Sequence, residues 1–241
     1  MQYSTGGDQL QDRVILITGA ARGIGASVAK ACATHGATVI LLDKQIKLLE
    51  AVYDEIEQAG GPTPAIYPLD LKGATLADYQ QLATTIDENF GKLDGLIHCA
   101  ATLGQLAPIQ HQDSKTWLET LHINLTAAYL LTQASLALLK KADRSNLIFS
   151  TDEHRDKAYW GAYGISKAGI EALSAQLADE LEAEGKVIVN CVDPGAVQTE
   201  LFARAFPALD PSSLTQPEQA AEQYISILCD ANHVQTQQTS V

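Results

Sequence analysis

Short apolar runs alternate with segments of helical periodicity along most of this chain. The runs predict strands at 14–18, 38–42, 65–69, 94–99, 146–150 and 186–192, and the periodic segments predict helices at 24–35, 46–59, 76–90, 114–140 and 161–184. Each crossover is long enough to hold a helix, and runs such as 14–17 are apolar throughout, which is typical of parallel strands buried on both faces. The alternation predicts an α/β fold: a doubly wound, Rossmann-like parallel sheet in three α/β/α layers, forming a single domain over residues 1–241.

The composition narrows the classes of function. Lys and Arg number 16 against 29 Asp and Glu, a net charge of −13 that repels nucleic acid. The four cysteines lie far apart without metal-ligand spacing, which favours reduced thiols in a cytoplasmic protein and no metal site. Residues 1–11 lack the pattern of a signal peptide, and no apolar run approaches the ~20 residues of a membrane span, so we expect no membrane partner.

Three glycines follow the first predicted strand directly. Gly19, Gly23 and Gly25 lie within the segment from Thr18 to Gly25, and a predicted helix begins at Ile24. Glycine lets the backbone turn tightly beside a ligand, while a helix N-terminus offers free N–H groups and a partial positive charge. This context predicts a site for the diphosphate of a dinucleotide, with an ordinary glycine turn as the alternative.

Asp43 ends the second predicted strand, where the adenosine ribose of a dinucleotide would lie. Its carboxylate can accept hydrogen bonds from the ribose hydroxyls and would repel a 2′-phosphate, which favours NAD as the cofactor. Arg22 and Lys44 are cations that could pair with that phosphate, so NADP remains the alternative.

Tyr163 and Lys167 are four positions apart in a predicted helix and therefore share one face. A neighbouring ammonium favours the phenolate, which lowers the pKa of the tyrosine and suits it to acid–base catalysis. Ser150 ends the fifth predicted strand at the same sheet edge, where its hydroxyl could hydrogen-bond a substrate oxygen. A surface tyrosine and a strand-end cap are the plainer interpretations of these residues.

Together these motifs resemble the short-chain dehydrogenase/reductase family, in its compact branch of about 250 residues. The resemblance covers residues 10–230 and is strongest to a poorly characterised bacterial subgroup of oxidoreductases. It implies a catalytic set of Asn124, Ser150, Tyr163 and Lys167, in which Asn124 holds a water that relays protons to the lysine. It also implies contacts of Asp70 with adenine and of the Pro194–Thr199 turn with the nicotinamide. The cofactor-binding residues expected in full are Gly19, Arg22, Gly23, Ile24, Gly25, Asp43, Asp70, Leu71, Ala100, Tyr163, Lys167, Pro194, Gly195, Val197 and Thr199.

Three features depart from that family's usual pattern. His98 stands where the family usually has Asn, and a histidine facing the core or the cofactor edge is favoured there over an acid–base role. The charged segment Asp152–Lys157 follows Ser150, and a solvated face is favoured over a polar substrate pocket. The chain ends at Thr239–Val241 without the usual close of a seventh strand, so we expect a homodimer through helices 114–140 and 161–184, with a tetramer less well supported.

The leading hypothesis is an NAD(P)-dependent oxidoreductase that transfers a hydride between the nicotinamide and a small carbonyl or alcohol substrate. Tyr163 would exchange the proton, Lys167 would lower its pKa, and Ser150 would polarise the substrate oxygen. A non-catalytic dinucleotide sensor or scaffold is the alternative. The substrate would be selected by residues 198–213, whose sequence names no ligand.

Overall fold

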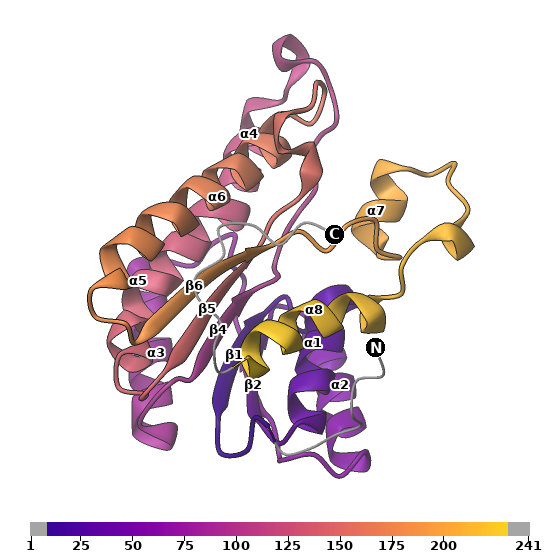
Figure 1. The fold of residues 1–241 in the computed structure, drawn as a ribbon. Coiled ribbons are helices and arrows are strands. Elements are labelled where there is room, and N and C mark those ends of the chain that lie inside the picture. The colour runs from indigo at the N-terminus through magenta and orange to yellow at the C-terminus, as the bar shows by residue number, and fades with distance from the viewer. Residues whose placement is uncertain (1–8, 231–241) are drawn as a thin grey trace.

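The computed structural model describes residues 9–230, which form one parallel sheet covered by helices on both faces (Figure 1). The six strands lie in the order β3-β2-β1-β4-β5-β6. Their bounds are β1 Val14–Thr18, β2 Thr38–Asp43, β3 Ala65–Pro68, β4 Gly95–His98, β5 Ser145–Ser150 and β6 Val187–Val192. This architecture confirms the predicted fold class. The strand order reverses between β1 and β4, the point at which ligands bind in such sheets.

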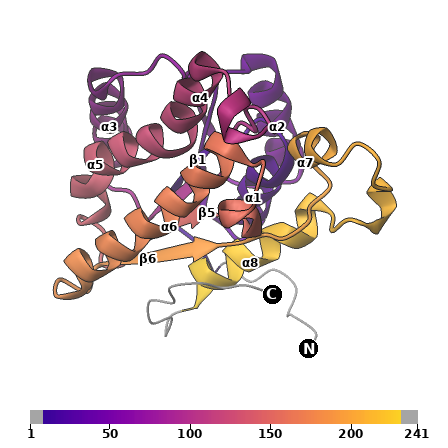
Figure 2. The ribbon, with the colours of Figure 1, turned by 90° about the horizontal axis from the view of Figure 1, so that it is seen from above.

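The helices divide into two layers that bury opposite faces of the sheet. One layer holds α1 Gly23–Thr34, α2 Ile46–Gln58 and α8 Pro217–Cys229. The other holds α3 Leu76–Phe90, α4 Ser114–Leu121, α5 Ala127–Leu139 and α6 Gly161–Glu182. Helices α1 and α8 lie side by side in both views, and the short α7, Glu200–Ala205, projects beyond the carboxyl ends of the strands (Figures 1 and 2).

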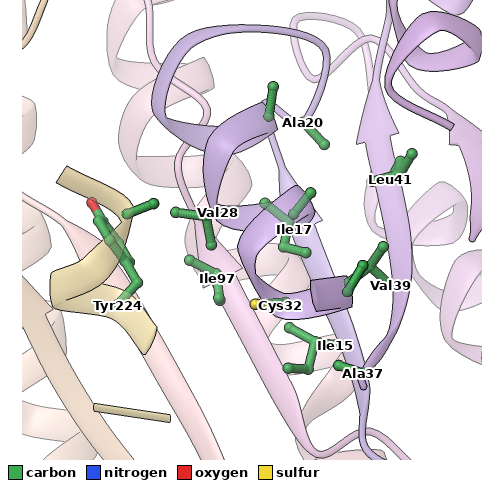
Figure 3. Packing of buried hydrophobic residues seen from close by; sticks show 14 of the residues in the cluster. Ile15, Ile17, Ala20, Val28, Cys32, Ala37, Val39, Leu41, Ile97 and Tyr224 are labelled. Carbon is green, nitrogen blue, oxygen red and sulfur yellow. The ribbon is translucent and has the colours of Figure 1, made fainter. Parts of the chain in front are cut away.

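Continuous apolar strands produce a core on each side of β1. Ile15 and Ile17 belong to the buried cluster beneath α1 and α8, which also contains Val28, Ile97 and Tyr224 (Figure 3). Leu16 points to the opposite layer. Because side chains alternate along a strand, the run 14–17 must be apolar at every position to satisfy both layers.

The long helix predicted at 114–140 is interrupted in the structure. A π-helical turn, His122–Thr126, separates α4 from α5. Such turns widen the helix and redirect side chains, and they occur often at functional sites. Asp113 caps the start of α4 by accepting a hydrogen bond from the Thr116 N–H at 2.8 Å.

Helix α8 was not predicted, although its start carries a signal. Gln216 and Gln219 form a capping box, and Pro217 occupies the first helical turn. Within residues 9–230, no helix is long and apolar enough to cross a bilayer. The predictions about residues 1–8 and about the end at 239–241 lie outside the described residues.

Candidate active site

A cleft of about 500 Å³ opens at the carboxyl ends of the strands. It is bounded by the turn after β1, the ends of β2 to β5 and the segment that follows β6. Every residue assigned to the cofactor from the sequence lines this cleft, as does Ser150. The parallel topology explains the convergence, since all carboxyl ends of a parallel sheet share one edge.

The glycine turn is tightly closed and leaves a helix N-terminus facing the cleft. Gly19 has φ +70°, and a Cβ added to Gly25 would overlap the Gly19 carbonyl oxygen and lie 2.7 Å from its carbon. Arg22 precedes α1 without a side-chain cap, and the first turn contains no acidic residue. Uncapped N–H groups beside a cradle that a Cβ would fill suit a diphosphate.

Charged groups of both signs surround the adenosine end of the cleft. Asp43 ends β2 and accepts a hydrogen bond from the Gln45 N–H at 3.0 Å. Lys44 Nζ lies 3.9 Å from Asp70 Oδ1. Arg22, at the glycine turn, forms an ion pair with Glu200 of α7. Each of these two cations therefore already has a carboxylate partner.

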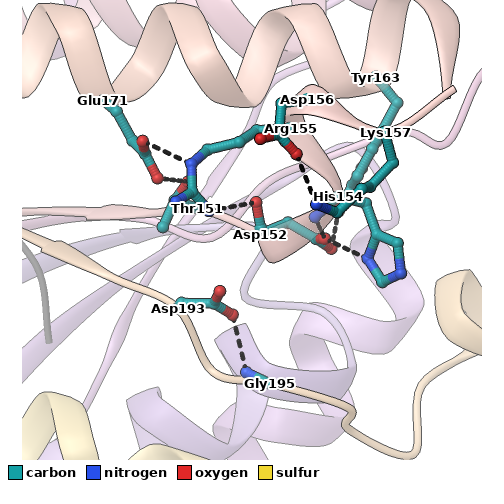
Figure 4. Close-up of polar contacts among 10 residues, drawn as sticks. All are labelled: Thr151, Asp152, His154, Arg155, Asp156, Lys157, Tyr163, Glu171, Asp193 and Gly195. Carbon is teal, nitrogen blue, oxygen red and sulfur yellow. Dashed lines mark hydrogen bonds and ion pairs between the residues drawn. The ribbon is translucent and has the colours of Figure 1, made fainter. Parts of the chain in front are cut away.

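The Tyr163 hydroxyl meets a carboxylate in the cleft. It donates a hydrogen bond to Asp152 Oδ2 at 2.8 Å (Figure 4). Ser150 does not occupy this position, because its hydroxyl hydrogen-bonds the Tyr224 hydroxyl at 2.8 Å and donates to Cys99 Sγ at 3.6 Å. The side chain beside the Tyr163 hydroxyl is therefore Asp152, whereas Ser150, which was expected to polarise a substrate oxygen there, is bonded to Tyr224 and Cys99.

Strand alternation explains why Asp152 rather than Ser150 lies beside the Tyr163 hydroxyl. Along β5, Ile148 packs in the layer of α1 and α8, and Phe149 packs in the layer of α6. Ser150 follows Ile148 by two positions and therefore faces Tyr224 of α8, whereas Tyr163 lies on α6. Asp152 lies beyond the end of β5, where the chain has turned toward α6.

Lys167 is buried behind Tyr163. Its Nζ donates to the Ser150 carbonyl oxygen at 2.8 Å and lies 5.6 Å from the centre of the Tyr163 ring. Burial lowers the pKa of Lys167. Burial, and after it the charge of Asp152, holds the pKa of Tyr163 well above its ordinary value. The sequence predicts a lowered pKa for this tyrosine from the nearby ammonium, whereas in the structure burial and, after it, Asp152 act in the opposite direction.

Asn124 lies in the π-helical turn and braces the loop after β4. Its side-chain oxygen accepts from the Thr102 N–H at 2.8 Å, and its amide donates to the Thr102 carbonyl oxygen at 2.9 Å. The amide also donates to Ser166 Oγ of α6 at 3.1 Å. Asn124 thus joins three elements behind the cleft, and its role in a water relay stays a prediction.

The charged segment Asp152–Lys157 divides between the cleft and solvent. Asp152 Oδ1 accepts from the backbone N–H of His154 at 2.8 Å and contacts His154 Nδ1 at 2.7 Å. Arg155 pairs with Glu171 of α6 at 2.8 Å, while Asp156 and Lys157 are exposed and pair with each other (Figure 4). The prediction of a solvated face is therefore wrong for Asp152 and holds for Asp156 and Lys157.

Aromatic rings form one wall next to Asp152. The His154 ring lies 4.0 Å from that of Trp160, and Trp160 lies 5.6 Å from the Tyr163 ring. Phe206, just after α7, lies 5.7 Å from Trp160 and 4.8 Å from Phe202. These contacts connect α7 to the start of α6 across the mouth of the cleft.

The match to known proteins agrees with this geometry. A family model described as short chain dehydrogenase matches residues 13–210. The chain belongs to the short-chain dehydrogenase family. Membership confirms the resemblance found in the sequence and makes the chain an oxidoreductase of that family.

Relatives of this short-chain dehydrogenase match it along nearly its whole length. The uncharacterized oxidoreductase YciK of Escherichia coli strain K12 is 38% identical over 241 residues, 99% of this chain and 95% of YciK. A short chain dehydrogenase of Shigella flexneri 2a, solved as a complex with NADP, is 38% identical with a TM-score of 0.92, covering 96% of this chain and 97% of that one. One from E. coli CFT073, complexed with NADPH, is 39% identical with a TM-score of 0.92, covering 96% of both chains.

Two residues of this dehydrogenase site escaped sequence reasoning. Asp152 could have been found by also considering polar residues just beyond the end of β5, and not only Ser150, the last residue of that strand. Tyr224, which is fully buried and holds the Ser150 hydroxyl, gave no signal beyond the pattern of α8. In the part of the chain that the structure describes, no group of three or more His, Cys, Asp or Glu residues could hold a metal ion.

His98 of this dehydrogenase is a core residue, as favoured from the sequence. It is 7% exposed, stacks on Phe149 at 4.8 Å, and its Nε2 lies 2.9 Å from Thr132 Oγ1. Burial lowers the pKa of His98 to about 3. The ring is therefore neutral at neutral pH.

The buried His98 should make stability depend on pH. Its pKa is depressed in the folded state, so its stabilising effect is complete above its unfolded value of about 6.5 and is lost as pH falls toward 3. Between pH 7 and pH 5, the wild type should lose about 2 kcal/mol more unfolding free energy than His98→Asn. Urea denaturation at both pH values measures this difference. His111→Asn, at an exposed position, should lose as much unfolding free energy between these pH values as the wild type does. An equal loss in His98→Asn would contradict the neutral, buried state of His98.

Proposed function

We propose that this chain is a nicotinamide-dependent oxidoreductase that transfers a hydride between its coenzyme and the carbon of a polar double bond. The carbonyl–alcohol pair is the substrate class expected from the sequence. The observation that carries the proposal is the meeting of Tyr163 and Lys167 in the same cleft as the glycine turn. A structural tyrosine would have no need of a buried lysine at that cleft.

The residues along the cleft fit a dinucleotide. The start of α1 would bind the diphosphate through Gly23, Ile24 and Gly25. Asp43 and Asp70 would bind the adenosine, and the turn from Pro194 to Thr199 would hold the nicotinamide. The bound coenzyme would supply or accept the hydride.

Tyr163 is the proton carrier in this proposal. Its hydroxyl reaches the cleft while its ring is 4% exposed, so a proton can be given to a bound substrate with little competition from water. Its raised pKa keeps the hydroxyl protonated before the reaction, as reduction requires, but makes it a weak acid whose proton passes most readily to a basic acceptor. Lys167 would stabilise the phenolate left behind, and Asn124 would support the path by which Tyr163 regains a proton.

The charges at the adenosine end favour NAD over NADP. Three carboxylates, those of Asp43, Asp70 and Glu200, surround two cations, Arg22 and Lys44. A 2′-phosphate there would have to displace an existing ion pair and approach Asp43. The NADP and NADPH complexes of the two relatives make NADP the alternative for this chain.

Removing the charge of Asp43 should weaken this preference. In Asp43→Asn, the ratio of NADP to NAD affinity should rise about tenfold, because one repulsive charge near the 2′-position is lost. Calorimetric titration with both coenzymes measures the ratio. Asp54→Asn, an exposed change on α2, is the matched control. An unchanged ratio in Asp43→Asn would remove Asp43 from the ribose site.

The proposed function is tested by following nicotinamide oxidation with a panel of carbonyl and imine substrates. Turnover with any member supports hydride transfer. Tight coenzyme binding without turnover across the whole panel would reject it and favour the sensor alternative.

Assembly and location belong to the same proposal. Leu118, Tyr129 and Ile165 on α4, α5 and α6 are apolar and 45% to 66% exposed, which supports a homodimer through this helical layer. Cys32, Cys99, Cys191 and Cys229 are all free thiols, in keeping with a cytoplasmic location.

A further inference from the structure

The polar group beside Tyr163 is an acceptor rather than a donor. Asp152 receives hydrogen bonds from the Tyr163 hydroxyl and the His154 backbone, and its other contact is the His154 ring. Its side chain is 25% exposed, so a substrate in the cleft can reach it. A serine hydroxyl could donate a hydrogen bond to a substrate oxygen at this place, whereas a carboxylate can only accept one.

This difference affects which double bond can be reduced. Hydride addition to C=O builds negative charge on oxygen, and a carboxylate in contact would oppose that charge. Hydride addition to C=N proceeds through a nitrogen that is protonated and positive, and the same carboxylate would stabilise it.

The surroundings of Asp152 also suit a cation. Asp193 lies on the same side, and its pKa is raised by burial and further by Asp152. Arg155 pairs with Glu171 and donates to the backbone carbonyl oxygen of Asp152 at 3.4 Å rather than to its carboxylate. The rings of Trp160 and Phe206 add faces that attract positive charge.

Cations are present at the cleft but occupy other positions. Lys167 lies behind the Tyr163 ring, bonded to the Ser150 carbonyl oxygen. Arg204 is exposed on α7 at the rim. His154 contacts Asp152 through one ring nitrogen, which orients the carboxylate while leaving its Oδ2 to Tyr163.

We propose that this chain reduces a carbon–nitrogen double bond, and that the substrate nitrogen replaces the direct hydrogen bond between Tyr163 and Asp152 by contacting both the hydroxyl and the carboxylate. This inference rests on the proposed function and names its substrate class: an imine that becomes a secondary or primary amine. The reductant is the reduced nicotinamide coenzyme.

The bonding changes balance with one hydride and one proton. The Tyr163 hydroxyl gives its proton to the imine nitrogen, and the new N–H donates to Asp152. The substrate carbon accepts the hydride, the C=N π pair becomes the nitrogen lone pair, and an amine results. Tyr163 then regains a proton from water. The raised pKa of Tyr163 is compatible with this step because an imine nitrogen is a much stronger base than a carbonyl oxygen.

The test compares cyclic imines with ketones of the same ring size in the full chain with reduced coenzyme. The wild type should favour the imine in kcat/KM by about 100-fold, a value typical of a hydrogen bond to a charged group. Asp152→Ser should lower this ratio about 100-fold, and Asp152→Asn, which keeps the shape, should lower it similarly. Asp156→Asn, an exposed carboxylate change in the same segment, should leave it unchanged.

Binding provides a readout that does not depend on turnover. Trp160 lies beside Tyr163, so its fluorescence in a Trp117→Phe background should report ligands in the cleft. Cyclic ammonium ions should bind about tenfold more tightly than the matching alcohols, and Asp152→Asn should abolish the difference.

The outcomes separate this inference from the proposed function. Ketone reduction with a ratio indifferent to Asp152 would overturn the inference and leave the hydride transfer intact. If no substrate is turned over, equal binding of ammonium and alcohol would overturn the inference as well. A preference for ammonium that requires Asp152 would support it.

Discussion

Tyr163→Phe should lower kcat about 1000-fold for any substrate that the enzyme turns over. The ring that packs against Trp160 would remain, so the fold and the coenzyme affinity should stay close to those of the wild type. The loss follows from removing the one atom that the proposal uses to deliver a proton. Steady-state turnover and coenzyme titration on the same preparation separate chemistry from binding.

The matched control for this variant is Tyr129→Phe. Tyr129 lies on α5 and is 45% exposed. The variant therefore removes the same hydroxyl group at a position outside the cleft. Its turnover should equal that of the wild type. If Tyr163→Phe keeps more than about a tenth of the wild-type kcat, Tyr163 is not the proton donor.

Gly25→Ala should damage both coenzyme binding and stability. The new Cβ would overlap the Gly19 carbonyl oxygen, and this neighbour is backbone, so the turn itself must open. We expect a loss of about 2 kcal/mol in unfolding free energy. Coenzyme affinity should fall at least about tenfold, because the N–H groups at the start of α1 would shift from the diphosphate.

Chemical denaturation and coenzyme titration measure these two effects. Gly73→Ala is the matched control, since a Cβ there would meet no atom within 4 Å and the backbone is not left-handed. If Gly25→Ala binds coenzyme as the wild type does, the diphosphate does not lie at this turn.

The fold was predictable because its signals are local. Apolar runs such as 14–17 require burial on both faces, and the glycines after β1 interrupt the pattern at a fixed place. All the residues assigned to the coenzyme meet in one cleft because parallel strands carry their carboxyl ends to one edge. The parallel topology therefore brings motifs that are far apart in the sequence to one site.

The details of the catalytic centre were not predictable by the same reasoning. The side chain beside Tyr163 depends on where β5 ends and on which side of the sheet Ser150 lies. Ser150 faces Tyr224, and the residue two positions later, Asp152, contacts the Tyr163 hydroxyl. The break between α4 and α5 is equally invisible to periodicity, because the π-helical turn at Asn124 is held by contacts with Thr102 and Ser166. Both features arise from tertiary packing.

The carboxylate of Asp152 changes how readily Tyr163 gives up its proton in this dehydrogenase site. A tyrosine beside a serine can become an effective base, whereas a tyrosine beside a carboxylate keeps its proton more firmly. Reduction as proposed needs this protonated form of Tyr163 and an acceptor basic enough to take its proton, and an imine nitrogen meets that second requirement better than a carbonyl oxygen does. The position of Asp152 also explains how the charged segment after β5 contributes to the site while Asp156 and Lys157 remain in solvent.

Hydride transfer at this cleft can be followed with an isotope. Reduced coenzyme carrying deuterium at the reactive ring carbon would be incubated with the protein and the matched imine and ketone panel. We expect products one deuterium heavier at the former double-bonded carbon, formed by the wild type and nearly absent with Tyr163→Phe. Coenzyme that binds tightly but never passes deuterium to any product would contradict the proposed hydride transfer.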